Sequence, residues 1–277
     1  MDEIRSRETR ALAELALVRL LHEVRDVDVL LVVLGGLVPQ TLANEDSSTP
    51  EHLGTTDVDL LLITHLDPGA NLGNVERALQ NLGFVPDPGE DGWRWRGLVE
   101  RTTVKLEFLC DLPNQREREI IRPSGCTALA AANLRGTGYV AWDYALRSLT
   151  GDLPDGRQVT VEARFAGLEG YLLSKCVALR ARAATKDYYD FVYVLAHNRA
   201  GGPEQAAQRL LEGKLASALP PLRSTFLEVR ERYLKTTDSG PVGYAEQALE
   251  VEPEVDVALL RADAVDVVQR FFAVLGV

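Results

Sequence analysis

Residues 55–63 read TTDVDLLLI, an apolar run that carries two carboxylates near its start. In a β-strand, successive side chains point to opposite faces, so Asp57 and Asp59 project from the same face. Like charges at this spacing repel each other. The usual relief is a divalent cation that prefers hard oxygen ligands, such as magnesium or manganese. A solvated strand end is the other explanation, and this stretch by itself does not decide between them.

The composition indicates a globular protein with a substantial core, because the chain has 277 residues of which 46% are hydrophobic. The first ten residues are charged where a signal peptide is apolar, and the longest apolar stretch, 29–38, is too short to cross a bilayer. We therefore expect a cytoplasmic protein without a membrane partner.

The cysteines and histidines give no sign of a metal or disulfide site. The three cysteines are odd in number and far apart, and no two of the four histidines show ligand spacing. We expect reduced thiols, and histidines that lie at the surface or in ordinary packing: His22, His52, His65 and His197.

The net charge of −11 argues against a protein that coats nucleic acid non-specifically, since phosphate binding needs an extended basic surface. A local basic patch remains possible. Its clearest candidates are four cations within twelve residues: Lys175, Arg180, Arg182 and Lys186.

The hydrophobic pattern changes once along the chain. It predicts a helix, a buried strand, the Asp-bearing strand, a second helix and several hairpin-like strands, and then long helices only. We expect an α+β fold, with a mixed-sheet domain at 1–165 and a helical domain at 166–277. The elements are predicted at 3–25, 27–36, 56–64, 71–82, 92–99, 102–109, 138–146 and 157–165.

Gly35 and Gly36 follow the first buried strand. Glycine lets the backbone approach a ligand closely, and the N-terminus of a following helix presents free N–H groups to a phosphate. Most glycine pairs after a strand form simple tight turns, which is the alternative here.

The segment VKLEFLCD (104–111) places Lys105, Glu107 and Asp111 on one face of a strand by its alternation. If this strand neighbours that of Asp57 and Asp59, Glu107 completes a cluster of three carboxylates. The alternative is a salt bridge between Glu107 and Lys105, or a solvated sheet face.

Two packed helices are predicted at 171–196, from apolar residues at helical spacing. Thr185 is the predicted cap of the second helix, with Asp187 in its first turn. Lys175 precedes them by about three turns. The simplest explanation for these charges is a solvated helix face.

Taken together and in this order, the Gly-Gly turn, the Asp-x-Asp strand, VKLEFL, SKCVALRAR (174–182) and KDYYDFVYVL (186–195) resemble the AbiEii-type toxin nucleotidyltransferases, including the MenT toxins, of the polymerase-β-like superfold. The resemblance covers about residues 28–197. The chain departs from the family in a longer segment before the Asp pair and in a glutamate where the third acid is more commonly aspartate.

The resemblance implies a metal-dependent nucleotidyltransferase that moves NMP from an NTP to an acceptor. Asp57 and Asp59 would bind Mg²⁺ or Mn²⁺, and Glu107 would bind the second ion and help ionise the attacking hydroxyl. Lys175 would be a phosphate cation, and Asp187 would orient that lysine or the acceptor. Gly35 and Gly36 would bind the nucleotide.

The acceptor implied by the MenT toxins is a tRNA 3′ end, with the protein acting as the toxin of a toxin–antitoxin pair. Phosphate and stacking contacts could come from the basic patch and from WRWR (93–96), whose tryptophans we expect in the core. The alternatives are nucleotidylation of a small hydroxylated compound, as in aminoglycoside nucleotidyltransferases, and a catalytically inactive binding module.

The helical segment is expected to select the acceptor. We predict that Lys175, Arg182 and Lys186 face the cleft of the site, with Arg180 and its neighbours contacting the acceptor. The competing view places these cations on a solvated outer face, where they contribute little.

Overall fold

The computed structural model describes residues 6–27, 29–47, 49–63, 72–182, 184–251 and 253–277. Their contacts divide the chain into two compact units. Unit 1 comprises residues 1–38 and 54–166, and unit 2 comprises residues 39–53 and 167–277. The segment 39–53, which we call the arm, therefore belongs with the C-terminal helices although it precedes the Asp-bearing strand in sequence.

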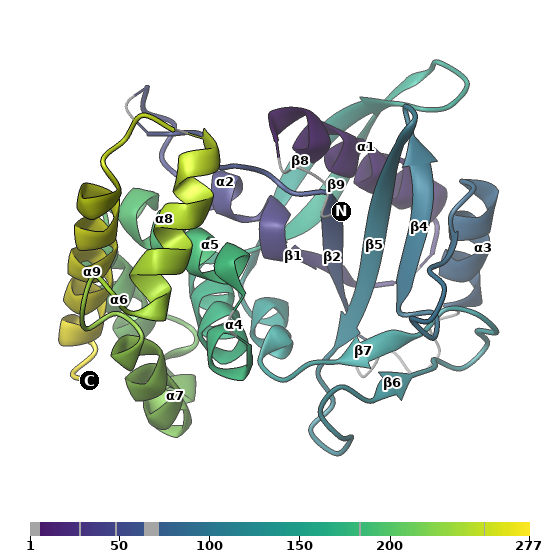
Figure 1. Cartoon of the computed structure of the whole chain (residues 1–277). Coiled ribbons are helices and arrows are strands. Elements are labelled where there is room, and N and C mark those ends of the chain that lie inside the picture. Colours follow the sequence, from purple (N-terminus) through teal and green to yellow (C-terminus); the bar gives the residue numbers. More distant parts are fainter. Residues whose placement is uncertain (1–5, 28, 48, 64–71, 183, 252) are drawn as a thin grey trace. The chain divides into compact units, whose positions relative to one another are not determined.

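Unit 1 is built on one mixed sheet (Figure 1). Its central strands follow the order β3-β4-β5-β2-β1-β9-β8, while β7 pairs with β5 and β6. The strands are β1 (Leu31–Leu34), β2 (Asp57–Leu62), β3 (Val85–Pro86), β4 (Arg94–Val99), β5 (Thr102–Cys110), β6 (Ile120–Ile121), β7 (Ala131–Asn133), β8 (Tyr144–Asp152) and β9 (Gln158–Ala166).

The mixed sheet and the helical C-terminal region confirm the expected α+β class. The segment 138–146 differs from its prediction. Residues Thr137–Ala141 form a short 3-10 helix (η2), and the strand begins only at Tyr144. Asp111 explains the difference, because its carboxylate accepts hydrogen bonds from the backbone N–H groups of Gly136 and Gly138 and holds this segment as a turn.

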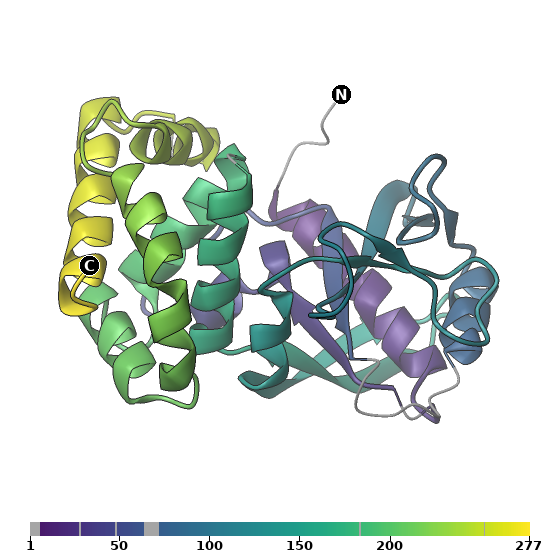
Figure 2. The same ribbon diagram turned by 90° about the horizontal axis from the view of Figure 1, so that it is seen from below.

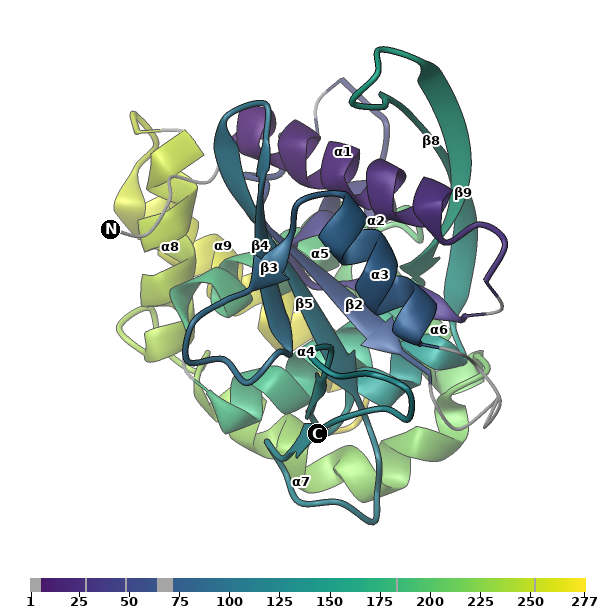
Figure 3. The same ribbon diagram turned by 90° about the vertical axis from the view of Figure 1, so that its right-hand side faces the viewer.

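Two helices of unit 1, α1 (Arg7–Glu23) and α3 (Gly73–Asn81), lie on the same side of the sheet (Figure 3). Helix α1 starts later than predicted because Ser6 caps it. The Ser6 hydroxyl accepts a hydrogen bond from the N–H of Thr9 at 3.1 Å. Residues 1–5 lie outside the described part of the chain.

The strand register shows which face α1 covers. A Cβ added to Gly151 would lie 2.9 Å from the side chain of Leu15 on α1. Strand pairing carries this face through Phe165 to Leu60 and Phe108, all of which are buried. Side chains at the alternate positions of β2 and β5 therefore project from the opposite face of the sheet.

Unit 2 consists of helices and the arm, and Figure 2 shows its later helices in green to yellow. Helix α5 packs on α8 and α9, and α4 packs on α7. Rings of Phe191, Tyr233, Phe271 and Phe272 form its aromatic core. The helices are α2 (Pro39–Leu42), α4 (Leu168–Ala181), α5 (Thr185–His197), α6 (Pro203–Glu212), α7 (Leu219–Glu231), α8 (Ser239–Val251) and α9 (Val257–Val274), with a 3-10 turn η3 (Ala216–Ala218).

Helix α5 begins at Thr185, one residue before the predicted start. Ala184 occupies the N-cap position without a side-chain hydrogen bond, so the prediction that Thr185 caps the helix is wrong. The N-cap side chain must come from the residue before the first helical position, and Thr185 is already helical. Asp187 does lie in the first turn. None of the described helices is long and apolar enough to span a membrane.

Candidate functional site

Strand pairing brings the three predicted carboxylates together in unit 1. Strand β2 pairs with β5 in parallel, and Asp59 is the register partner of Glu107. This confirms that the strand of Glu107 neighbours that of the two aspartates. Because paired residues share a face of the sheet, Asp57, Asp59 and Glu107 project from the side opposite α1.

Gly35 lies against Asp59. It follows β1, whose last residue, Leu34, is the antiparallel partner of Asp59. A Cβ at Gly35 would lie 1.8 Å from Asp59 Oδ2, and the φ of Gly35 is +71°. Both the left-handed backbone and the close approach require glycine. A larger residue at position 35 would displace the Asp59 carboxylate.

Gly36 approaches a different side chain. Its Cβ would lie 2.7 Å from the Cβ of Thr55, so glycine lets the turn pack against the entry to β2. Residues Gly35–Leu37 form a single 3-10 turn (η1), and the helix that follows, α2, has four residues. The helix that follows the glycines is therefore only about one turn long, and nucleotide binding by the two glycines stays a prediction.

Arg94 on β4 is the partner that the sequence did not reveal for Glu107. It is the antiparallel register partner of Glu107. Its Nε donates to Glu107 Oε1 at 2.8 Å, and its Nη1 donates to Glu90 at 3.0 Å. Its Nη2 lies 2.7 Å from the same Glu107 oxygen in an ion pair. Burial opposes the charge of Arg94, but attraction to Glu107, Glu90 and Asp57 outweighs it and raises the arginine pKa. The expected alternative partner for Glu107 was Lys105, which lies on the same strand.

The two tryptophans of WRWR differ in burial. Trp95 is fully buried, as expected, and its Nε1 donates to the carbonyl of Gly92. Trp93 is only partly buried, and the Arg94 guanidinium lies 4.6 Å from its ring centroid. This cation–π contact helps to keep the Arg94 guanidinium beside the carboxylates.

The carboxylates suit a metal ion that arrives with a nucleotide. Magnesium is commonly held by one or two carboxylates together with substrate phosphates, and Asp57 and Asp59 provide that donor set. Among the residues that the structure describes, no group of three His, Cys, Asp or Glu side chains is arranged to hold a metal. A preformed three-carboxylate cage is thus not present while Glu107 binds Arg94, and its ligand role stays a prediction.

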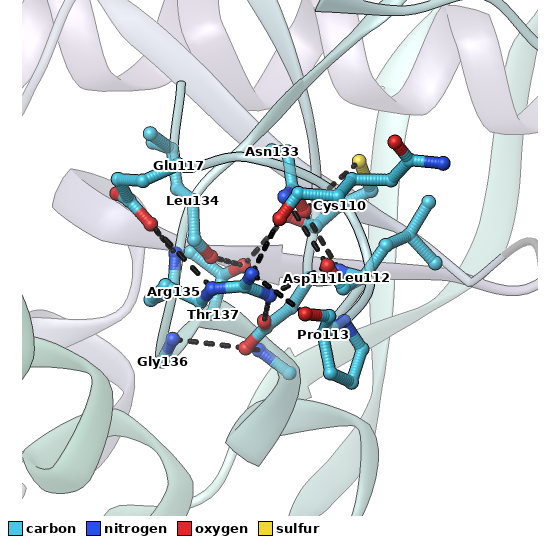
Figure 4. Close-up of polar contacts among 12 residues, drawn as sticks. Cys110, Asp111, Leu112, Pro113, Glu117, Asn133, Leu134, Arg135, Gly136 and Thr137 are labelled. Carbon is cyan, nitrogen blue, oxygen red and sulfur yellow. Dashed lines mark hydrogen bonds and ion pairs between the residues drawn. The ribbon is translucent and has the colours of Figure 1, made fainter. Parts of the chain in front are cut away.

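Asp111, on the same strand face by alternation, belongs to a separate structural cluster (Figure 4). Its Oδ2 accepts hydrogen bonds from the N–H groups of Gly136 and Gly138 at 2.8 and 3.0 Å. The Arg135 guanidinium donates to the carbonyls of Leu112, Pro113 and Gln115. Because backbone donors hold this carboxylate, Asp111 fixes the loop after β5.

In unit 2, Lys175 lies in a buried ionic network. Its Nζ donates to Asp187 Oδ1 at 3.0 Å and to Asp190 Oδ2 at 3.1 Å, and the three side chains are at most 7% exposed. Burial acts to lower the pKa of Lys175, yet the acidic groups of Tyr171, Asp187 and Asp190 outweigh it and raise that pKa above its ordinary value. Lys175 is therefore not a cation on a solvated face.

Arg182 joins the network from its rim. Its Nε donates to Asp187 Oδ2 at 2.7 Å, while its own side chain is 50% exposed. Burial acts to raise the pKa of Asp187, but Lys175 and Arg182 outweigh it and lower that pKa. Arg180 pairs instead with Glu228, and Lys186 is exposed. Acceptor binding by Arg180, Arg182 and Lys186 stays a prediction.

His52 is the residue that the sequence reasoning missed. It lies in the arm, its side chain is 0% exposed, and its Nε2 is 3.0 Å from Asp190 Oδ1. The residue was expected at the surface or in ordinary packing. No periodicity links positions 52 and 190, and the only available signal is that an imidazole lies in the segment where the chain departs from the AbiEii pattern.

The cysteines agree with their prediction. Cys110, Cys126 and Cys176 are free thiols in the structure. Burial raises the pKa of Cys110 to about 12 and that of Cys126 to about 11. Both thiols therefore stay protonated near neutral pH and do not act as nucleophiles there.

Comparisons with known proteins add one distant likeness. No family model and no curated protein matches the chain. Among solved structures, a STING-associated CdnE c-di-GMP synthase from Capnocytophaga granulosa is similar over 99% of this chain and 84% of that chain, with 12% identity and a TM-score of 0.33. At this level the likeness supports no inference about activity. The AbiEii and MenT resemblance stays a prediction from the sequence.

Proposed function

We propose that the protein is a metal-dependent nucleotidyltransferase that moves NMP from an NTP to a hydroxyl acceptor. The observation that carries the proposal is the register of β2 and β5, which sets Glu107 beside Asp59 on the face that Asp57 shares. Gly35 supports it, because a glycine there is what leaves room for the Asp59 carboxylate.

In the proposed reaction, an acceptor oxygen bonds to the α-phosphorus, the bond from that phosphorus to the β-phosphate oxygen breaks, and pyrophosphate leaves. Bound magnesium would supply positive charge to the triphosphate and to the developing negative charge. Asp57 and Asp59 hold the donor positions, and Glu107 accepts the proton of the attacking hydroxyl. Lys175 is proposed as a phosphate cation and Asp187 as the residue that orients it.

The Arg94–Glu107 ion pair must open before Glu107 can take its full part in the proposed reaction. Arg94 occupies Oε1 of Glu107, with Nη2 at 2.7 Å, so Glu107 can use both of its oxygens for a metal ion or a proton only after the guanidinium has moved. A freed Arg94 would lie next to the triphosphate, where a planar guanidinium binds phosphate well. We propose that nucleotide binding replaces this ion pair.

The acceptor that we propose is a tRNA 3′ end, which would make the protein the toxin of a pair with a cognate antitoxin. Incubation with each α-labelled NTP, magnesium and total tRNA tests this directly. Label in tRNA supports the proposal. Label that appears only on an added aminoglycoside would instead favour the small-molecule alternative.

A second candidate is a catalytically inactive binding module. The Arg94–Glu107 pair favours it, because a carboxylate that stays paired with a guanidinium is a weaker base and a weaker metal ligand. Nucleotide binding with no transferred label to any acceptor, and no gain of transfer in an Arg94→Gln variant, would support this candidate over the enzyme.

A further inference from the structure

We propose that Thr55 is a positioning residue that holds Asp57 in the direction that a metal ligand needs. The inference rests on the proposed function, in which Asp57 binds magnesium together with a nucleotide. It goes beyond that function, because Thr55 precedes β2 and takes no part in the proposed reaction itself. Thr55 and the carboxylates belong to the same unit of the structure.

The backbone of Asp57 lies where β2 loses one of its two neighbours. The antiparallel ladder of β2 with β1 ends at the pair of Asp59 and Leu34. On the other side β5 continues past Asp57, and the N–H of Lys105 donates to the Thr56 carbonyl at 3.4 Å. Successive residues of a strand direct their N–H and C=O groups to opposite sides. The N–H and C=O of Asp57 therefore point away from β5, beyond the end of the β1 ladder.

Thr55 provides the hydrogen-bond partner that β1 does not provide at this position. Its Oγ1 accepts a hydrogen bond from the N–H of Asp57 at 3.1 Å and donates to the Asp57 carbonyl at 3.1 Å. A hydroxyl can do both because it has one donor and two lone pairs. Thr55 is only 7% exposed, so water has little access to this contact. The hydroxyl therefore fixes the backbone at the first residue of β2.

The backbone at Asp57 decides where its carboxylate points. Alternation places Asp57 on the face of Asp59 and Glu107 only while residue 57 keeps the strand conformation. The Thr56 hydroxyl lies 3.4 Å from Asp57 Oδ1, but this is longer than an ordinary hydrogen bond between two oxygens. Thr55 thus sets the direction of the Cα–Cβ bond. Metal ligands must converge on one ion, so a change in this direction should weaken metal binding.

The glycine turn after β1 contacts the supports of both aspartates. A Cβ on Gly35 would lie 1.8 Å from Asp59 Oδ2, and a Cβ on Gly36 would lie 2.7 Å from the Cβ and 2.8 Å from the Oγ1 of Thr55. Gly35 has a positive φ, whereas Gly36 does not, so the close approach to Thr55 is what favours glycine at position 36. The turn therefore fits Asp59 directly and Asp57 through Thr55.

Three substitutions separate the hydrogen bonds of Thr55 from its packing. Thr55→Val keeps the shape of the side chain but removes the hydroxyl. Thr55→Ser keeps the hydroxyl but removes the methyl group. Gly36→Ala leaves Thr55 in place and sets a methyl group against its hydroxyl. A positioning role predicts losses in the first and third variants and function in the second, whereas a packing role predicts function in Thr55→Val and a loss in Thr55→Ser.

The first readout needs no ligand. Hydrogen exchange of the Asp57 amide, followed by NMR in the protein without nucleotide or metal, reports the bond to Thr55. We expect Thr55→Val to speed this exchange about tenfold, which corresponds to about 1.4 kcal/mol, and Thr55→Ser to stay within about twofold of the wild type. The amide of Leu60, in the middle of β2, should keep its exchange rate.

The second readout is calorimetric titration with magnesium and ATP, CTP, GTP and UTP in turn. We expect Thr55→Val and Gly36→Ala to weaken the binding of the preferred NTP about tenfold, and Thr55→Ser to change it less than about twofold. The matched control is Thr137→Val, because Thr137 is a buried threonine of the same unit whose hydroxyl donates to the Leu134 carbonyl at 2.7 Å. Its NTP affinity should equal that of the wild type. If Thr55→Val does not fold, as judged by circular dichroism, Thr55→Ala takes its place.

The outcomes distinguish the inference from the proposed function. Unchanged exchange of the Asp57 amide in Thr55→Val, an equal rise at Leu60, or unchanged NTP affinity in that variant overturns the inference alone. So does an equal loss of NTP affinity in Thr55→Ser or in Thr137→Val. Failure of the wild type to bind any of the four NTPs, or full binding in an Asp57→Asn/Asp59→Asn variant, overturns the proposed function together with the inference.

Discussion

The two charged clusters of this protein have a similar composition and different access to water. In the sheet of unit 1, Arg94 pairs with Glu107 close to Asp57, and its side chain is 25% exposed. In unit 2, Lys175 binds Asp187 and Asp190 with all three side chains nearly enclosed. Partly solvated ion pairs exchange partners at small cost, whereas an enclosed charge that loses its partner is strongly destabilising.

The difference assigns the clusters different tasks. We propose that the sheet cluster releases its internal cation and accepts a metal ion with a nucleotide. The network in unit 2 has a fixed geometry, so it is suited to holding one ammonium in one orientation. We expect the sheet cluster to exchange its counter-ion and the network of unit 2 to depend on keeping its ammonium.

The largest effect is expected from the paired aspartates. Asp57→Asn/Asp59→Asn should lower the rate of nucleotidyl transfer roughly a thousandfold, as follows from a loss of ~4 kcal/mol of transition-state stabilisation. Thermal unfolding should be little changed, since the substitution removes like charges from a partly exposed strand face. An undiminished rate of NTP turnover in this variant would exclude the site.

The next effect tests the enclosed network. Lys175→Met should lower the free energy of unfolding by about 3–5 kcal/mol, because two buried carboxylates lose the ammonium that they share. Urea unfolding measures the change. The matched control is Lys186→Met, an exposed lysine on the neighbouring helix, for which a change below about 0.5 kcal/mol is expected. Equal effects of the two substitutions would show that Lys175 is not held as described.

Glu76 shows what hydrogen-bond donors without a paired cation do for a buried carboxylate. It accepts hydrogen bonds from the N–H groups of Thr127, Ala128 and Leu129 and from the Thr127 hydroxyl. Burial acts to raise the Glu76 pKa, but these hydrogen bonds outweigh it and lower the pKa from 4.5 to about 2. Glu76→Gln should reduce the free energy of unfolding by about 1–3 kcal/mol near neutral pH.

The pH dependence of this contribution has a definite sign. Because the Glu76 pKa is lower in the folded chain, its contribution is complete above pH 4.5 and is lost as the pH falls toward 2. The difference in unfolding free energy between wild type and Glu76→Gln should therefore shrink as the pH is lowered from 5 to 3. Urea unfolding of both proteins at each pH measures this difference. A constant difference over this range would contradict the assignment.

The smallest effect concerns the exchangeable ion pair. Arg94→Gln should change the free energy of unfolding by less than about 1 kcal/mol, since the pair is partly solvated. It should also tighten magnesium binding severalfold, because it removes a positive charge from beside Glu107 and Asp57. Arg96→Gln, two positions along the same strand face, is the control. Weaker magnesium binding in Arg94→Gln alone would show that the arginine does not compete with the metal.

Local patterns predicted much of the sheet cluster. Alternation in TTDVDLLLI and VKLEFLCD places Asp57, Asp59 and Glu107 correctly on their strands, because side-chain direction has a period of two residues. The partner of Glu107 was not predictable in this way. Arg94 meets Glu107 only because β4 pairs with β5 in one particular register, which depends on the turn between them.

The network of unit 2 was less accessible to sequence reasoning. Helical spacing predicts α4 and α5, but Asp190 and His52 are 138 positions apart and meet only through the packing of the arm on α5. A charged residue in a helical pattern is ordinarily expected to face solvent. The competing interpretation of Lys175 and Asp187 is therefore a solvated helix face. Their burial depends on tertiary contacts that no local pattern contains.

We propose that the carboxylates of β2 and β5 bind a nucleotide together with magnesium. Calorimetric titration of the wild type and of Asp57→Asn/Asp59→Asn with each NTP, with magnesium and with EDTA in its place, tests it most directly. We expect the wild type to bind at least one NTP, and this binding to require both magnesium and the two aspartates. Equal NTP affinity in EDTA or in the double variant would contradict it.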